Sequence, residues 1–153
     1  MPVAQGLTRW QEQHGKLSAD ERLLLGSLYY VAGRNREAFD ALQSVEPEMK
    51  PGSQHRWCLV AIVTTLLRQD RLTEAESMIR QLEAAYPDAA EVDEARYRLA
   101  AHYFDKRELK QAKECFDSLL DSTQSVMYRV MCNEYLHRIQ HFESIEEKKR
   151  TNS

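Results

Sequence analysis

The sequence predicts an all-α fold built from three copies of a 37-residue helical hairpin. Apolar residues recur at intervals of three and four, which is the period of an amphipathic helix. Only five Gly and four Pro occur among 153 residues, and so few breakers favour helices over many short strands. Five columns of similar residues recur every 37 positions, and such a period is the signature of a repeat architecture. They are Ala38, Ala75 and Ala112; Leu25, Ile62 and Leu99; Tyr29, Leu66 and Tyr103; Leu42, Ile79 and Phe116; and Val45, Leu82 and Leu119.

The first 17 residues are predicted to form an N-terminal capping helix. Residues 3–14, with Leu7 and Trp10, have helical spacing, and Gly15 ends the segment as glycines commonly end helices. A stack of repeats exposes an apolar face at each end, so a terminal helix is expected to cover it.

The three repeats are predicted over residues 18–122, each with two helices. Ser18 and Glu21 form the S-x-x-E capping box that opens the first helix. In that helix apolar residues recur at helical spacing, as in Leu25, Leu28, Tyr29 and Ala32. Turns inside the repeats are expected at Gly33, Asp70 and Lys106–Arg107, and Pro47, Pro51 and Pro87 fall in the links between repeats.

Residues 123–153 are predicted to be a C-terminal capping helix with a frayed tail. Its apolar stripe is aromatic and runs through Tyr128, Cys132, Tyr135, Ile139 and Phe142. One interpretation is a cap that packs on the third repeat. The other is a helix that extends past the repeats and offers its far half to a partner or to a second copy, with Tyr128, Tyr135, Ile139 and Phe142 as the self-association residues.

Composition predicts a single soluble, cytoplasmic domain over residues 1–153. The hydrophobic fraction is 42% and the charged fraction 29%, as in globular proteins. A net charge of −3 weighs against nucleic acid as a partner. The apolar run Leu23–Val31 is too short for membrane insertion, and residues 1–15 lack the layout of a signal peptide. Three widely spaced cysteines match no zinc or redox spacing and suit a reducing compartment.

Motifs for catalysis, cofactors and metals are not found in the sequence. Acidic pairs such as Asp20-Glu21 are adjacent, and neighbours on a helix point about 100° apart, which does not make an acid–base pair. His137 and His141 stand four residues apart but no third ligand has matching spacing. We therefore expect no enzyme activity, no cofactor and no metal.

The repeat columns resemble the tetratricopeptide family. Its Leu-Gly and Tyr are matched by Leu25-Gly26 and Tyr29, its Ala and closing Pro by Ala75 and Pro87, and its later columns by Leu99, Tyr103, Ala112 and Phe116. The resemblance implies a right-handed α-α superhelix. The period exceeds the family's usual value of about 34 by three residues, and Val63 and Ala100 replace the glycine. A narrower likeness, in Tyr86-Pro87-Asp88 and the segment 93–99, is to repeats of bacterial envelope-assembly proteins, which suggests a bacterial origin.

The resemblance also implies a concave groove, lined by the first helices, that binds a peptide or an amphipathic helix. The groove residues that follow are Leu23, Ser27, Tyr30, Trp57, Val60, Thr64, Arg68, Tyr97, Arg98 and Phe104. Members that hold the acidic tails of heat-shock chaperones use Lys, Asn and Arg at five positions, of which only Arg98 is matched here. The predicted function is a non-catalytic adaptor or secretion-type chaperone for another protein. The alternative is a self-associating structural component that forms a homodimer through its C-terminal helix. Coverage of the groove by the terminal helices or by a second subunit stays open.

Overall fold

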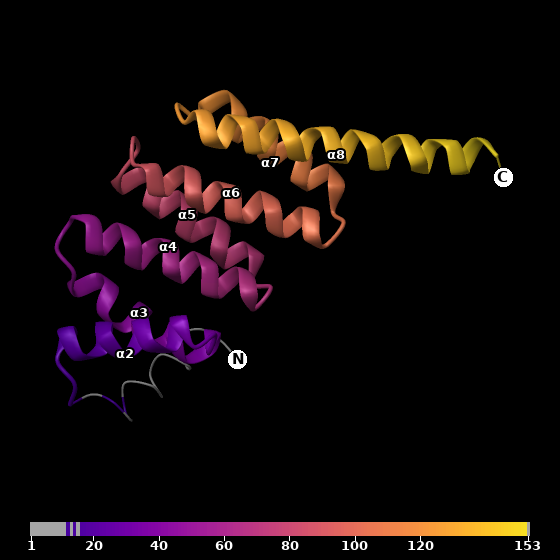
Figure 1. Cartoon of the computed structure of the whole chain (residues 1–153). Helices are drawn as coiled ribbons and strands as arrows, with labels where there is room; N and C mark the ends of the chain where they lie inside the picture. The colour runs from indigo at the N-terminus through magenta and orange to yellow at the C-terminus, as the bar shows by residue number, and fades with distance from the viewer. Residues whose placement is uncertain (1–11, 13, 15, 153) are drawn as a thin grey trace. The chain divides into compact units, whose positions relative to one another are not determined.

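A computed structural model describes residues 12, 14 and 16–152, and within that part of the chain it contains helices and no strand (Figure 1). The all-α prediction is confirmed. The elements are α2 (Ala19–Val31), α3 (Asn35–Val45), the short 3-10 helix η1 (Glu46–Glu48), α4 (Ser53–Arg68), α5 (Leu72–Ala85), α6 (Ala90–Asp105), α7 (Leu109–Ser122) and α8 (Val126–Thr151). The helix predicted over residues 3–14 lies outside the described residues except at Glu12 and His14.

The chain divides into two compact units, and each is described by itself below. The first ends at Val92 and the second begins at Asp93, so the boundary falls within α6. The first unit holds the hairpins α2–α3 and α4–α5. The second holds the rest of α6 together with α7 and α8.

The turn inside each hairpin repeats with the period that the sequence predicts. Gly33, Asp70 and Arg107 all have positive φ, at 75°, 59° and 62°, and the second helix of each hairpin begins two residues later. In each turn the N–H of the following residue donates to the carbonyl five residues before it, from Arg34 to Tyr29, from Arg71 to Leu66 and from Glu108 to Tyr103. These bonds satisfy carbonyl groups at a helix end. The predicted turns are confirmed, and the 37-residue period is a property of the backbone.

The repeat columns of the second helices are buried in the core. The three alanines of the first column, Ala38, Ala75 and Ala112, are fully buried. The bulky columns of the second helices are buried with them, namely Leu42, Ile79 and Phe116, and Val45, Leu82 and Leu119. The position of these alanines is small in all three repeats because a larger side chain would overpack the enclosed site.

The helices of the first hairpin are in close contact at Gly26. A Cβ atom added there would lie 2.8 Å from Leu42 Cδ2 and 3.2 Å from Ala41 Cβ. Gly26 is the one buried residue of α2. The glycine of this column is therefore required by packing against α3.

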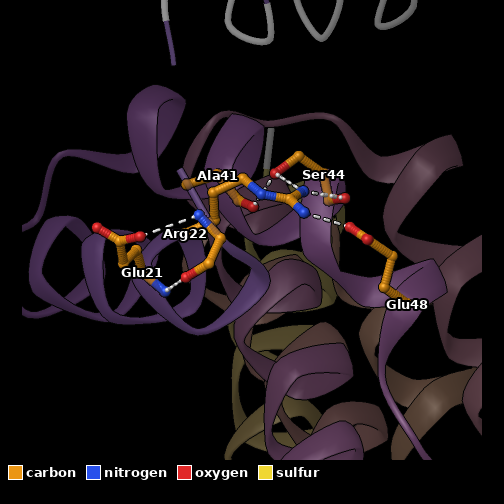
Figure 2. A network of polar contacts seen from close by, with 6 residues as sticks. Glu21, Arg22, Ala41, Ser44 and Glu48 are labelled. Atoms are coloured by element: carbon orange, nitrogen blue, oxygen red, sulfur yellow. Dashed lines mark hydrogen bonds and ion pairs between the residues drawn. The ribbon is translucent and has the colours of Figure 1, made fainter. Parts of the chain in front are cut away.

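A polar network fastens the start of α2 to the end of α3 (Figure 2). The predicted capping box is confirmed, with the Glu21 N–H 3.2 Å from Ser18 Oγ and the Ser18 N–H 3.1 Å from Glu21 Oε1. The guanidinium of Arg22 donates to the Ser44 carbonyl at 2.8 Å and also pairs with Glu48. Charge-assisted bonds of this kind are stronger than neutral ones, and they fix the ends of the hairpin.

A second polar network joins the two hairpins of the first unit and includes Tyr86. Its hydroxyl accepts a bond from the Gly52 N–H at 3.1 Å and lies 2.8 Å from His55 Nδ1. His55 Nε2 in turn lies 2.8 Å from Glu46 Oε1. Tyr86 therefore holds the segment before α4 against the end of α5. It is also part of the Tyr86-Pro87-Asp88 segment that resembles bacterial envelope-assembly repeats.

We predict that Gly26→Ala destabilises the protein by about 1–3 kcal/mol, because the added methyl group overpacks against Leu42. Helix propensity alone gives the opposite sign, a gain of about 1 kcal/mol. Urea unfolding measures the difference. In a double-mutant cycle, Leu42→Ala should make Gly26→Ala much less harmful, since it removes the atoms that clash. A Gly26→Ala variant as stable as the wild type would contradict the packing argument.

Candidate functional site

Three of the predicted groove residues come together on the surface of the first unit. The Tyr30 ring meets the Trp57 ring edge to face, with 5.8 Å between the ring centroids. The Arg68 guanidinium lies over the same Tyr30 ring, 5.1 Å from its centroid. Arg68 also donates to Asn35 Oδ1 at 3.4 Å. We call Tyr30, Trp57 and Arg68 the aromatic–arginine cluster.

The cluster is accessible because α4 is exposed mainly at its two ends. Trp57 is 40% exposed and Arg68 is exposed as well, whereas every residue of α4 between them is buried. Val60 and Thr64 share the face of Trp57 and Arg68 by helical spacing, yet they are only 5% and 4% exposed. The Thr64 hydroxyl donates to the Val60 carbonyl at 2.9 Å, so its polarity is satisfied within the helix. These two predicted groove residues present little surface to a ligand.

The remaining predicted residues of α2 are half-buried beside the cluster. The Ser27 hydroxyl donates to the Leu23 carbonyl at 2.8 Å, which leaves it little capacity as a donor to a ligand. Leu23 and Ser27 can therefore contribute surface next to Tyr30 rather than a specific polar contact.

Helix α2 also exposes an apolar stripe that is not among the predicted groove residues. Leu24, Leu28 and Val31 are 62%, 59% and 84% exposed. Leu28 and Ala32, two of the apolar residues at helical spacing in this segment, are exposed, whereas Leu25 and Tyr29 are half-buried. Several faces of α2 are apolar, so only the position of Gly26 against α3 shows which one is packed. In the sequence, the position of Gly26 is taken by Val63 and Ala100 in the later repeats. This column of small and apolar residues was the signal for the packed face of α2.

The predicted groove residues of the second unit lie in an aromatic cluster with α8. Tyr135 stacks on Phe116 with 4.6 Å between ring centroids and 13° between planes. It meets Phe104 edge to face at 5.0 Å and Tyr97 at 6.0 Å. Tyr97 also contacts Tyr128 at 5.7 Å. Phe104 is buried and Tyr97 half-buried, while half-exposed Arg98 pairs with Glu94 at 3.0 Å. Here α8 covers the predicted groove residues Tyr97 and Phe104.

The aromatic stripe of α8 is occupied by its own chain. Cys132 and Ile139 are buried, and Tyr128, Tyr135 and Phe142 are half-buried. The Arg107 guanidinium lies over both the Phe104 ring, at 5.1 Å, and the Phe142 ring, at 4.9 Å. Burial, and secondly a hydrogen bond with Tyr135, raises the pKa of the Tyr97 hydroxyl. The residues proposed for self-association thus leave little free surface for a second copy.

The far part of α8 has a different environment. Every residue from Glu143 to Thr151 is exposed, and the helix runs on beyond α7 (Figure 1). The helix therefore combines the features of both interpretations, a cap over its first part and a free helical extension over its last turns. The extension is rich in charge, and Ile145, at 37% exposure, is its one large apolar side chain.

Within the described residues no three His, Cys, Asp or Glu side chains are grouped as a metal site requires, and His137 and His141 are both exposed. Among the described helices none is long and apolar enough to cross a membrane.

Comparison with protein-family models and with curated proteins finds no match for this chain. The resemblance to tetratricopeptide repeats therefore stays a prediction from the repeat columns.

We predict that two of the three cysteines are unreactive in the folded protein. Burial, with Glu46 nearby, raises the pKa of Cys58 to about 12, and burial, with Asp93 nearby, raises that of Cys132 to about 11. The thiolate is the reactive form, so both groups stay protonated at pH 8. A chromogenic disulfide reagent should label about one thiol per chain when folded and all three in denaturant. The Cys115→Ser variant should show none when folded, and rapid labelling of that variant at pH 8 would contradict the burial of the other two.

Proposed function

We propose that this protein is a non-catalytic interaction module whose first unit binds a segment of another protein at the aromatic–arginine cluster. The observation that carries the proposal is an accessible Trp57 and Tyr30 in edge contact, with Arg68 over the Tyr30 ring. Trp, Tyr and Arg are the residues that most often dominate binding energy at protein interfaces. Their mutual contacts hold the side chains in place, which lowers the entropy lost on binding.

The chemistry of the cluster indicates what kind of segment it takes. Trp57 offers an apolar ring face, and half-buried Leu23, two turns before Tyr30 on α2, adds apolar surface. Arg68 bonds to Asn35, and none of the described carboxylates pairs with it. A guanidinium in that state favours a carboxylate from a partner. A peptide or helix with a large apolar residue close to an acidic residue is the ligand that fits.

The wider role is proposed on the same basis. The repeat columns support a tetratricopeptide-like module, the composition supports a cytoplasmic location, and the size and helix count support an adaptor or secretion-type chaperone. The homodimer through Tyr128, Tyr135, Ile139 and Phe142 receives less support, because those side chains pack within their own unit.

A peptide-display selection on the intact protein tests the proposal. The enriched peptides should combine an apolar anchor with an Asp or Glu. Trp57→Ala should weaken the best peptide by about 2 kcal/mol or more, roughly 30-fold in Kd. Arg68→Ala should weaken it less, and mainly for the acidic peptides. Isothermal titration measures both, with circular dichroism as a check that the helices remain.

Arg80→Ala is the matched control for Arg68→Ala, since Arg80 is an exposed arginine of α5 in the same unit. It should leave the affinity unchanged. Selected peptides that bind Trp57→Ala and Arg68→Ala as well as the wild type would overturn the assignment of the site.

A further inference from the structure

The exposed stripe of α2 has the geometry of one side of a helix pair. Leu24, Leu28 and Val31 are separated by four and then three residues, and all are more than half exposed. On another face of the same helix Gly26 packs against Leu42, so the stripe is not the surface that forms the hairpin. Spacing of four and three places apolar side chains along the seam between two packed helices. This seam has no partner among the described residues.

The sequence just before α2 carries a matching stripe. Val3, Leu7 and Trp10 are also separated by four and three residues; they lie outside the described residues and enter only through their sequence. Between them stand polar or small residues such as Gln5 and Thr8, as an amphipathic helix requires.

A turn precedes α2 at the place where the two stripes could be brought together. Lys16 and Leu17 form a turn and a bend, and the Leu17 N–H donates to the His14 carbonyl at 3.0 Å. In two antiparallel helices joined by a short turn, residues equally far from the turn lie opposite each other. Counted from Leu17, Trp10 falls opposite Leu24, Leu7 opposite Leu28 within one residue, and Val3 opposite Val31.

We propose that the α2 stripe is a docking surface for the chain's own N-terminal segment, held in the register Trp10 to Leu24, Leu7 to Leu28 and Val3 to Val31. A tether of a few residues gives the segment a millimolar effective concentration at the stripe. A second copy or a separate partner has to bind without that advantage. The inference is independent of the aromatic–arginine cluster, which involves the neighbouring face of α2.

Disulfide trapping in the full chain tests the register. In a Cys115→Ser background, Leu7→Cys and Leu28→Cys are introduced together and oxidised at micromolar protein concentration. The native Cys58 and Cys132 are buried, so they should not interfere. We expect most chains to form an intramolecular disulfide, seen as a monomer band of altered mobility on a non-reducing gel and as the loss of two thiols. The control pair Leu7→Cys with Ser77→Cys, on exposed Ser77 of α5, should stay reduced or form it far less.

The other occupants give distinct results. A disulfide-linked dimer would show that a second copy covers the stripe, and two free thiols per chain would show that the stripe is open. Either result overturns the proposal. Equal trapping in the control pair would overturn the register as well.

Fluorescence gives a second measurement that needs no new cysteine. The chain has two tryptophans, so Trp57→Phe leaves Trp10 as the only one. Its emission should be blue-shifted relative to free tryptophan and should move to the red when Leu24→Asp is added. Arg80→Asp, on α5, is the control that should leave it unchanged. Emission of a fully solvated tryptophan before Leu24→Asp would overturn the proposal.

Discussion

The structure depends on the close approach of paired helices at positions that admit only small side chains. Ala38, Ala75 and Ala112 are fully buried in the second helices, and in the first hairpin Gly26 leaves no room for even one methyl group beside Leu42. Because the contact is so close, the turn that joins the helices has to be short and uniform. Each of these turns contains one residue with positive φ, namely Gly33, Asp70 and Arg107, and this backbone conformation keeps the turn short.

Both units leave apolar side chains exposed, among them Val126, Met127 and Val130 in the second, and they differ in where their aromatic side chains lie. In the second unit α8 places Tyr135 between Phe104 and Phe116, so the aromatic surface is used inside the chain. In the first unit Trp57 and the α2 stripe stay exposed. Such patches on a soluble protein commonly mark binding surfaces. One of them, beside Arg68, suits a foreign segment, and the other matches the spacing of the chain's own N-terminal residues.

The candidate site was predicted in part. Tyr30, Trp57 and Arg68 follow from the helical positions that the repeat assigns to its first helices. The same rule predicts Val60 and Thr64 as groove residues, but both are buried. Helical periodicity shows which residues share a face of a helix, and it does not show whether a neighbouring element covers that face. The pairing of Arg68 with Tyr30 and Asn35 joins residues too far apart in sequence for any local pattern to show it.

The sequence by itself determined the helices, the 37-residue period, the turns, the capping box and the small and bulky columns of the core. These features are local, or they repeat, so they leave a mark in spacing that one chain is enough to reveal. Only the tertiary structure decided which apolar faces are covered. It packs the aromatic stripe of α8 against α6 and α7 and leaves Leu24, Leu28 and Val31 exposed. The physical reason is that burial depends on a neighbouring helix from elsewhere in the chain, and an apolar residue has the same spacing whether that neighbour is present or not.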